Sequence, residues 1–306
     1  MTGYLAPEGY VSELLAELST YKKVKVEKVY ERLILTSGPL VPAAWSQNTW
    51  INPREIAFES ITQAATALKA LQRNWALYSV QSHRRAALIE AKLPKVSRKV
   101  LEFPIGALPT APMGSWTLLE NNLLLASPHC SSPFPDGEVH FTENKSGPPS
   151  RAYLKLWEAL TLSGVAPGPG ERCLDMGSSP GGWTWVLQQL GAEVVSVDKA
   201  PLAIEIASLP RIEFLRRDAF GLDPKEMGSV DWFFSDVICY PQKLLELVQK
   251  WLKAGKCGKF VCTIKFQGDK LSDEDRAAVR GLAEIPNSSV RHLFHNKHEL
   301  TWTKLK

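Results

Sequence analysis

Apolar runs and polar breaks divide the chain into two parts. From residue 150 onward, short apolar runs of strand length alternate with segments whose apolar residues recur at helical spacing. This alternation predicts an α/β domain over 150–306 with a mostly parallel, doubly wound sheet. The last two strand-like runs, 290–295 and 299–304, are joined by a short connection. We therefore expect the final strand to be antiparallel.

The first 130 residues mix strand-like and helix-like runs in smaller groups. Residues 1–40 predict a strand, a helix and two more strands, and residues 41–130 predict a second α+β unit. Residues 131–149 are rich in Ser, Pro and Gly and predict a linker. The expected helices cover 11–18, 56–73 and 84–91, and the expected later strands cover 75–80, 100–103 and 116–126.

The most informative stretch is residues 172–198, RCLDMGSSPGGWTWVLQQLGAEVVSVD. One apolar run ends at Asp175, a glycine-rich turn leads into a helix, and a second apolar run ends at Asp198. Such a unit offers free backbone N–H groups at the helix start and a carboxylate for the hydroxyls of a ribose. The outline suits a dinucleotide, S-adenosylmethionine (SAM) or an ordinary glycine-rich turn.

Two residues of this stretch favour SAM. Pro180 lacks the N–H and the free φ that a pyrophosphate-binding turn needs. Asp175 would repel a diphosphate, whereas it suits the ammonium and sulfonium charges of SAM. We expect residues 179–183 to wrap the methionine part, Asp198 to bind the ribose and Asp218 the adenine. The full set expected to bind the cofactor is Asp175, Gly177, Ser179, Pro180, Gly181, Gly182, Trp183, Asp198, Asp218 and Asp236.

Ionisable residues also follow other strands of the predicted sheet. Asp236 and Lys265 end neighbouring strands, so they should lie close together. Such a pair is often only a structural ion pair. A catalytic role needs a second cation to lower the pKa of the lysine, and Lys155 could supply it, with Glu299 balancing the charge.

Several motifs together resemble the FtsJ/RrmJ-type Rossmann methyltransferases, which modify the ribose 2′-hydroxyl of RNA. The motifs are PSRAYLKL, DMGSSPGGWT, SVD, RDAF, SDV, TIKF and HELT, over about 149–306. The resemblance implies a catalytic tetrad of Lys155, Asp236, Lys265 and Glu299, with Lys265 as the general base. It also implies SAM as cofactor and no metal, because the sulfonium is already activated.

The variant motifs LDMGSSPGGWT, SVDKAP, RRDAF and HNKHELTW resemble members that methylate a cytidine of 23S rRNA. The implied partner is large-subunit rRNA before full ribosome assembly. Members of this kind carry a ferredoxin-like segment and a THUMP domain ahead of the catalytic domain. By that resemblance, residues 1–40 are expected to be ferredoxin-like and residues 41–130 THUMP-like and RNA-binding.

Composition adds little that is specific. The 306 residues carry a formal net charge of +4, which allows an RNA partner without demanding one. The basic positions between 84 and 99 are either a phosphate-contacting surface or a solvated helix face: Arg84, Arg85, Lys92, Lys95, Arg98 and Lys99. Five cysteines without disulfide or zinc spacing fit a reducing cytoplasm. We expect no signal peptide and no membrane span, and favour a monomer.

Alternatives stay open at this point. The core could methylate another RNA, such as a tRNA or a cap, or belong to a non-catalytic RNA-binding relative. A small-molecule methyltransferase is a further alternative, although the lysine pair would have no evident purpose there. His292, His295 and His298 could suggest a metal site. Their three-residue spacing alternates faces in a strand, so we expect loop or surface histidines.

Overall fold

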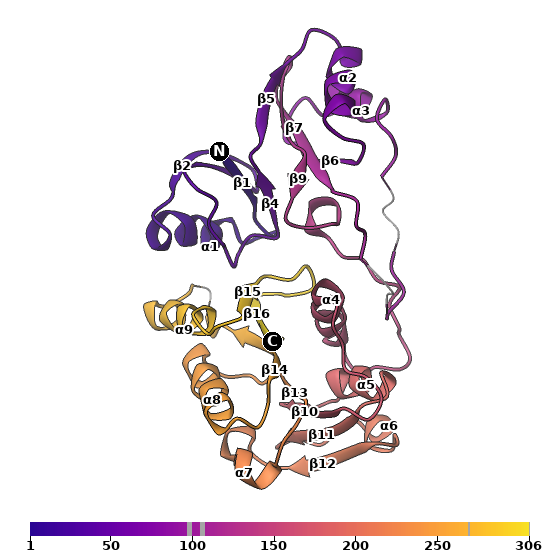
Figure 1. The fold of residues 1–306 in the computed structure, drawn as a ribbon, viewed down its shortest axis with the longest axis vertical. Coiled ribbons are helices and arrows are strands. Elements are labelled where there is room, and N and C mark those ends of the chain that lie inside the picture. The colour runs from indigo at the N-terminus through magenta and orange to yellow at the C-terminus, as the bar shows by residue number, and fades with distance from the viewer. Residues whose placement is uncertain (97–99, 105–107, 269, 306) are drawn as a thin grey trace. The chain divides into compact units, whose positions relative to one another are not determined.

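The computed structural model describes residues 1–96, 100–104, 108–268 and 270–305. The chain divides into two compact units (Figure 1). The first comprises Met1–Leu101 and Ala107–His140, and the second comprises Glu102–Gly106 and Phe141–Lys306.

The first unit contains two sheets. One has the order β2-β3-β1-β4-β9 and is antiparallel throughout. Its strands are β1 (Thr2–Leu5), β2 (Lys25–Tyr30), β3 (Leu33–Ser37), β4 (Asn48–Ile51) and β9 (His129–Cys130), and its helix is α1 (Val11–Ala16) with a π-helical extension, Glu17–Tyr21. The sheet therefore continues past residue 40, because β4 pairs with the central strand β1 and β9 pairs with β4.

The other sheet of the first unit has the order β5-β8-β7-β6. Its strands are β5 (Arg54–Ala57), β6 (Trp75–Leu77), β7 (Gly114–Glu120) and β8 (Leu123–Ser127), with helices α2 (Ile61–Leu71) and α3 (His83–Glu90). Trp116 and Leu118 pack with Ala64 and Leu68 of α2 in its core. A short 3₁₀ turn, Pro135–Gly137, lies in the expected linker.

The second unit is built on a seven-stranded sheet of order β12-β11-β10-β13-β14-β16-β15. Its strands are β10 (Arg172–Met176), β11 (Glu193–Asp198), β12 (Ile212–Arg216), β13 (Trp232–Ser235), β14 (Lys259–Lys265), β15 (Ser288–Arg291) and β16 (Glu299–Lys304). The strands β10 to β14 are parallel, whereas β16 is antiparallel to both β14 and β15. The predicted Rossmann-like sheet with an antiparallel last strand is confirmed.

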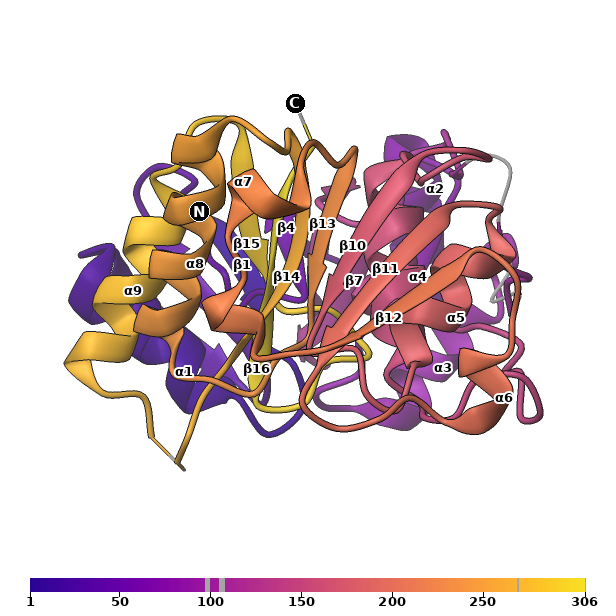
Figure 2. The same ribbon diagram turned by 90° about the horizontal axis from the view of Figure 1, so that it is seen from below.

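Helices cover both faces of this sheet. They are α4 (Tyr153–Ser163), α5 (Gly182–Gln189), α6 (Ile204–Ala207), α7 (Pro224–Met227), α8 (Pro241–Ala254) and α9 (Asp273–Ala283). Figures 1 and 2 show α8 and α9 on one side of the sheet and α4, α5 and α6 on the other. The central strands are apolar because both their faces are buried; all four residues of β13, for example, are buried.

The strand order creates a crevice. The chain runs outward from β10 through β11 to β12 and then returns to β13 on the other side of β10. Ligands of such sheets bind where the strand order reverses, beyond the carboxyl ends of the strands. The ends of β10 and β13 are therefore the first place to look for a site.

Some element predictions were wrong. The helix expected over 56–73 begins at Ile61, because Ser60 caps it, and 54–57 forms a strand. The strand expected over 100–103 is absent from the described part of that segment apart from a single bridge at Leu101. The strand expected over 290–295 ends at Arg291, and the residues after it form a turn. None of the helices within the described residues has the length and apolar character needed to cross a lipid bilayer.

The basic cluster of the first unit falls partly on helix α3. Arg84 and the later Lys92 and Lys95 are exposed, whereas Arg85 lies over the ring of Phe58 at 5.4 Å. Arg98 and Lys99 lie outside the described residues. The choice between an RNA-contacting surface and a solvated face therefore stays a prediction.

Candidate active site

The glycine-rich turn after β10 closely approaches the loop after β13. Gly177 has a φ of +75°, a conformation that favours glycine. A Cβ at this position would lie 2.6 Å from the Cα of Val237. The backbone N–H of Gly177 donates to the carbonyl of Val197 at 2.9 Å. The turn is thus fixed between two neighbouring strand ends.

Gly177→Ala is expected to destabilise the protein and to weaken cofactor binding, because both the positive φ and the contact with Val237 oppose a methyl group. Gly255→Ala is the matched control, since Gly255 has a φ of +62° but nothing within 4 Å of its would-be Cβ. We expect the control to lose about 1 kcal/mol and Gly177→Ala clearly more. Thermal unfolding and calorimetric SAM titration measure both effects. Equal losses of stability in the two variants would show that Val237 moves to admit the methyl group at no energetic cost.

A cavity of about 350 Å³ lies at the carboxyl ends of β10, β11 and β13. Eight of the ten residues predicted to bind the cofactor line it: Asp175, Gly177, Ser179, Pro180, Gly182, Trp183, Asp198 and Asp236. The cavity is also lined by residues that the sequence did not single out: Ser150, Ala152, Ser178, Val237 and Ile238. Lys265, predicted as a catalytic residue and not as a cofactor contact, lines it as well.

Gly181 and Asp218 are not among the residues that line this cavity. Gly181 begins helix α5 with a φ of +117°, and a Cβ there would lie 2.8 Å from Ile206. Asp218 forms an ion pair with Lys199 at 2.9 Å and accepts a hydrogen bond from the N–H of Phe220 at 3.1 Å. Its half-exposed carboxylate stays a predicted adenine contact.

Asp175 provides a test of whether the cavity fits SAM. Its carboxylate is fully buried, and Oδ2 accepts a 2.6 Å hydrogen bond from Oγ1 of Thr184. Its Oδ1 and the buried Oγ of Ser178 have no hydrogen-bond partner among the described residues. Burial raises the pKa of Asp175 to about 7. A buried acidic group with an unused oxygen suits a cationic ligand such as the ammonium of SAM.

Asp198 already has backbone partners. Its Oδ2 accepts from the N–H of Ser179 at 3.0 Å and its Oδ1 accepts from the N–H of Ala200 at 2.9 Å. These bonds hold the glycine-rich turn against the end of β11. Because each carboxylate oxygen can accept a second bond, the predicted ribose contact is compatible with this geometry.

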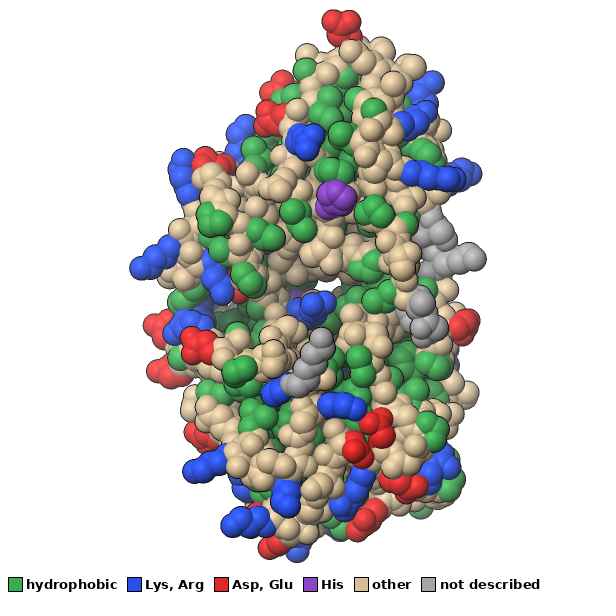
Figure 3. Space-filling view, viewed as in Figure 1, with side chains coloured by type: hydrophobic (Ala, Val, Ile, Leu, Met, Phe, Trp, Pro, Cys, Tyr) green, Lys and Arg blue, Asp and Glu red, His purple; other side chains and the backbone are tan. Residues whose placement is uncertain are grey.

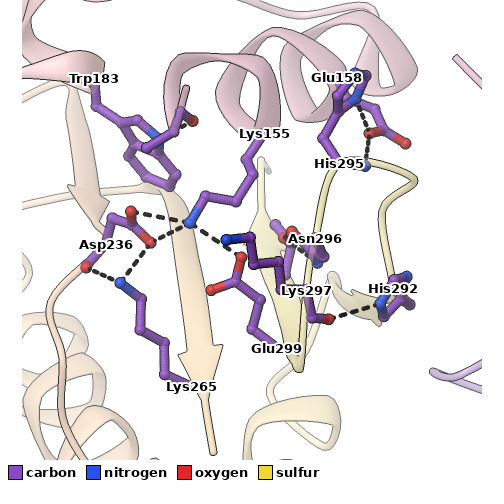
Figure 4. A network of polar contacts seen from close by, with 12 residues as sticks. Lys155, Glu158, Trp183, Asp236, Lys265, His292, His295, Asn296, Lys297 and Glu299 are labelled. Carbon is purple, nitrogen blue, oxygen red and sulfur yellow. Dashed lines mark hydrogen bonds and ion pairs between the residues drawn. The ribbon is translucent and has the colours of Figure 1, made fainter. Parts of the chain in front are cut away.

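Four charged residues from four segments meet beside the cavity (Figure 4). Lys155 on α4 is 2.8 Å from Oδ1 of Asp236 and 3.1 Å from Oε1 of Glu299. Lys265 donates to the backbone carbonyl of Asp236 at 2.7 Å and lies 3.2 Å from its Oδ1. The structure thus brings together all four residues of the predicted tetrad.

The sheet explains why these residues meet. Lys265 and Glu299 are direct partners across the antiparallel pair of β14 and β16, so their side chains share one face. Asp236 follows β13, the parallel neighbour of β14. Burial lowers the pKa of Lys155, but the ion pairs with Asp236 and Glu299 outweigh burial, and the net effect raises it above its usual value. Lys155 is therefore a fixed positive charge.

Comparison with known proteins finds a family match over most of the second unit. Residues 148–271 match the family model described as FtsJ-like methyltransferase. The second unit contains an FtsJ-like methyltransferase domain.

Curated relatives of this chain carry the name Ribosomal RNA large subunit methyltransferase M. The relative from Halorhodospira halophila is 34% identical over 157 residues, covering 50% of this chain and 46% of the relative. The relative from Marinobacter nauticus is 33% identical over 185 residues, covering 56% and 50%. The chain thus spans about half the length of the curated relatives it matches. Among solved structures, the Methanococcus jannaschii fibrillarin pre-rRNA processing protein is 20% identical, with a TM-score of 0.40 over 49% of this chain and 74% of that one.

Sequence reasoning missed supporting residues of the FtsJ-like domain. Thr184 joins the carboxylate of Asp175 to the hydroxyl of Ser196, 2.8 Å away. The only sequence signal was a hydroxyl residue in the first turn of an otherwise apolar helix. Glu158 on α4 was also missed, although it lies one helical turn after Lys155.

The three histidines lie in or beside the turn between β15 and β16. His292 is buried, yet it lies in the loop that follows β15, so the expectation of loop or surface histidines holds for it. Burial lowers the pKa of His292 to about 4, so the ring is neutral near pH 7. Because a carbonyl oxygen can only accept, Nε2 carries the ring proton and donates to the carbonyl of Lys297 at 2.9 Å. Nδ1 of His295 lies 2.7 Å from Glu158, and the ring of His298 packs against Phe266.

Proposed function

We propose that the protein transfers a methyl group from SAM to a ribose 2′-hydroxyl of RNA, most specifically of a cytidine in 23S rRNA. The observation that carries the proposal is the cluster of Lys155, Asp236, Lys265 and Glu299 beside the cavity of an FtsJ-like domain. The printed name of the relatives supports rRNA, and the motif resemblance supports the cytidine.

The cavity residues hold the cofactor in this proposal. Asp175 and the turn from Ser179 to Trp183 bind the methionine part, and Asp198 binds the ribose. When bound, SAM supplies a methyl group on a positively charged sulfur. The protein contributes position, by holding the acceptor hydroxyl and the methyl group in line.

Lys265 acts as the general base in this proposal. Its Nζ would take the proton of the 2′-hydroxyl, leaving the oxygen free to accept the methyl group as the methyl–sulfur bond of SAM breaks and S-adenosylhomocysteine leaves. Asp236 fixes Lys265 through its backbone carbonyl and its carboxylate. A lysine accepts a proton only when its amine carries a free lone pair, so the proposal requires Lys265 to react as the neutral amine.

The substrate side of the proposal includes the first unit. We keep residues 1–40 as a ferredoxin-like segment and residues 41–130 as a THUMP-like RNA-binding domain, with rRNA encountered in the cytoplasm before full ribosome assembly. Figure 3 shows, on the face it draws of the second unit, that Lys and Arg are interspersed with Asp and Glu.

Methyl transfer is tested by incubating the protein with methyl-labelled SAM and unmodified 23S rRNA and mapping the product by mass spectrometry. The proposal expects label on the 2′-oxygen of a single cytidine. Label in tRNA or in a capped RNA would correct the substrate. SAM binding without label in any of these RNAs would contradict the reaction.

Two exposed apolar side chains on the loop after Asp236 predict how the RNA is held. Ile238 is 75% and Tyr240 is 62% exposed, and both follow Asp236 on the loop to α8. We expect Tyr240 to stack on a nucleobase near the target ribose, a contact worth about 1–3 kcal/mol. Tyr240→Ala should raise the KM for RNA at least about fivefold with little change in SAM affinity, while Tyr240→Phe keeps the ring and stays near wild type. Similar KM values for both variants would exclude stacking by Tyr240.

A further inference from the structure

The turn between β15 and β16 is attached to helix α4 by one buried carboxylate. Oε1 of Glu158 accepts a hydrogen bond from the N–H of Phe294 at 2.8 Å, and Oε2 accepts from the N–H of His295 at 2.9 Å. Nδ1 of His295 adds a third bond to Oε2 at 2.7 Å. Glu158 is only 1% exposed, so these donors replace the water that its charge has lost (Figure 4).

The turn has internal bonds of its own. The N–H of Asn296 donates to the carbonyl of Leu293 at 3.0 Å, and the side chain of His292 donates to the carbonyl of Lys297. The N–H of Glu299 donates to the same carbonyl at 2.8 Å. These bonds connect the two ends of the turn, so its position sets where Glu299 enters the cluster.

Helix α4 holds this piece at two points. Lys155 binds the carboxylate of Glu299 at 3.1 Å, and Glu158, one helical turn later, binds the backbone of residues 294 and 295. The ring of His295 also packs at 5.6 Å from that of Phe141. Neither Glu158 nor His295 lines the cavity, so neither is placed to touch a cofactor there.

We infer that Glu158 is a positioning residue for the active site: by docking the 293–298 turn on α4, it places the carboxylate of Glu299 against Lys155. This inference rests on the proposed function. Without Glu158, two backbone N–H groups lose their acceptor and the turn loses its attachment. Glu299 then no longer holds Lys155 in one place beside Asp236.

Glu158→Ala is expected to lower kcat about tenfold or more, with SAM affinity within about twofold of wild type, because Glu158 is remote from the cavity lining. The kcat of Glu158→Gln should lie between those of wild type and Glu158→Ala, since the amide oxygen of the glutamine can still accept one of the backbone hydrogen bonds. Thr161→Val is the matched control. Thr161 lies buried one turn later on α4, and its hydroxyl has no hydrogen-bond partner among the described residues. It should behave as wild type.

A double-mutant cycle separates positioning from general stability. If Glu158 acts through Glu299, adding Glu158→Ala to Glu299→Ala should lower kcat by less than about twofold further. A full tenfold loss on that background would overturn the inference, because Glu158 would then act independently of Glu299. An unchanged kcat in Glu158→Ala would overturn it as well.

A second measurement tests the inference without any RNA substrate. The pKa of Lys155, followed by NMR of its labelled side chain without RNA, should fall in Glu158→Ala because Glu299 no longer holds the ammonium. The same fall should occur in Glu299→Ala and not in Thr161→Val. If wild type methylates no RNA, the proposed function fails, whereas this titration still decides the inference. An unchanged Lys155 pKa in Glu158→Ala would overturn it.

Discussion

Lys265→Ala should reduce methyl transfer to rRNA by roughly a thousandfold, within the range that general-base catalysis contributes. Lys265 lines the cavity, and its Nζ is held by two oxygens of Asp236, as the proposed general base requires. Removing it leaves no amine at this place to accept the proton. SAM affinity should change by less than about threefold, because the residues proposed to bind the cofactor lie mainly in the turn after β10 and at the end of β11.

Two further variants make this result specific. Lys265→Arg keeps a cation beside Asp236 but cannot lose its proton, so it should be nearly as inactive as the alanine variant. Lys259→Ala is the matched control, because Lys259 begins the same strand and pairs with Glu171 at 3.1 Å. Single-turnover rates and calorimetric SAM titrations check all three. An arginine variant with wild-type activity would show that Lys265 acts by its charge and not as a base.

Local sequence pattern was sufficient for the catalytic half of the fold. The strands β10 and β13 are buried on both faces, so each appears in the sequence as an apolar run whose ends mark the strand ends. The short link before β16 indicated the antiparallel strand. The same logic failed for residues 292–295, because His292 and Leu293 are buried in a turn rather than in a strand. Burial alone does not distinguish these two structures.

The proximity of Asp236 and Lys265 could be expected because the sheet fixes both strand ends, whereas the full tetrad was implied by the family resemblance. Asp236 and Lys265 end neighbouring parallel strands, and Lys265 faces Glu299 across an antiparallel pair. Glu158 could not be found in this way. Its position on α4 shows one acidic residue among apolar ones, and nothing local reveals that its partners lie 136 and 137 residues later. Only tertiary packing explains why a carboxylate is buried there.

SAM affinity should fall about tenfold between pH 8 and pH 6 because of Asp175. Burial raises the pKa of this carboxyl to about 7 in the free protein, so at pH 6 it is mostly protonated and must lose its proton before it can pair with a cation. The ordinary value is 3.8, so stability from this group is present below that pH and is lost as pH rises through about 7. Bound SAM should offset that loss.

Asp175→Asn tests this assignment directly. Its side-chain oxygen can still accept the hydrogen bond from Thr184, which keeps the local structure. The variant should bind SAM at least about tenfold more weakly at pH 8 and show little change in affinity between pH 6 and pH 8. Unfolding of the free variant should also lose the pH dependence that Asp175 causes. Because any titration of SAM itself affects both proteins equally, a pH dependence that survives in Asp175→Asn would assign it to another group.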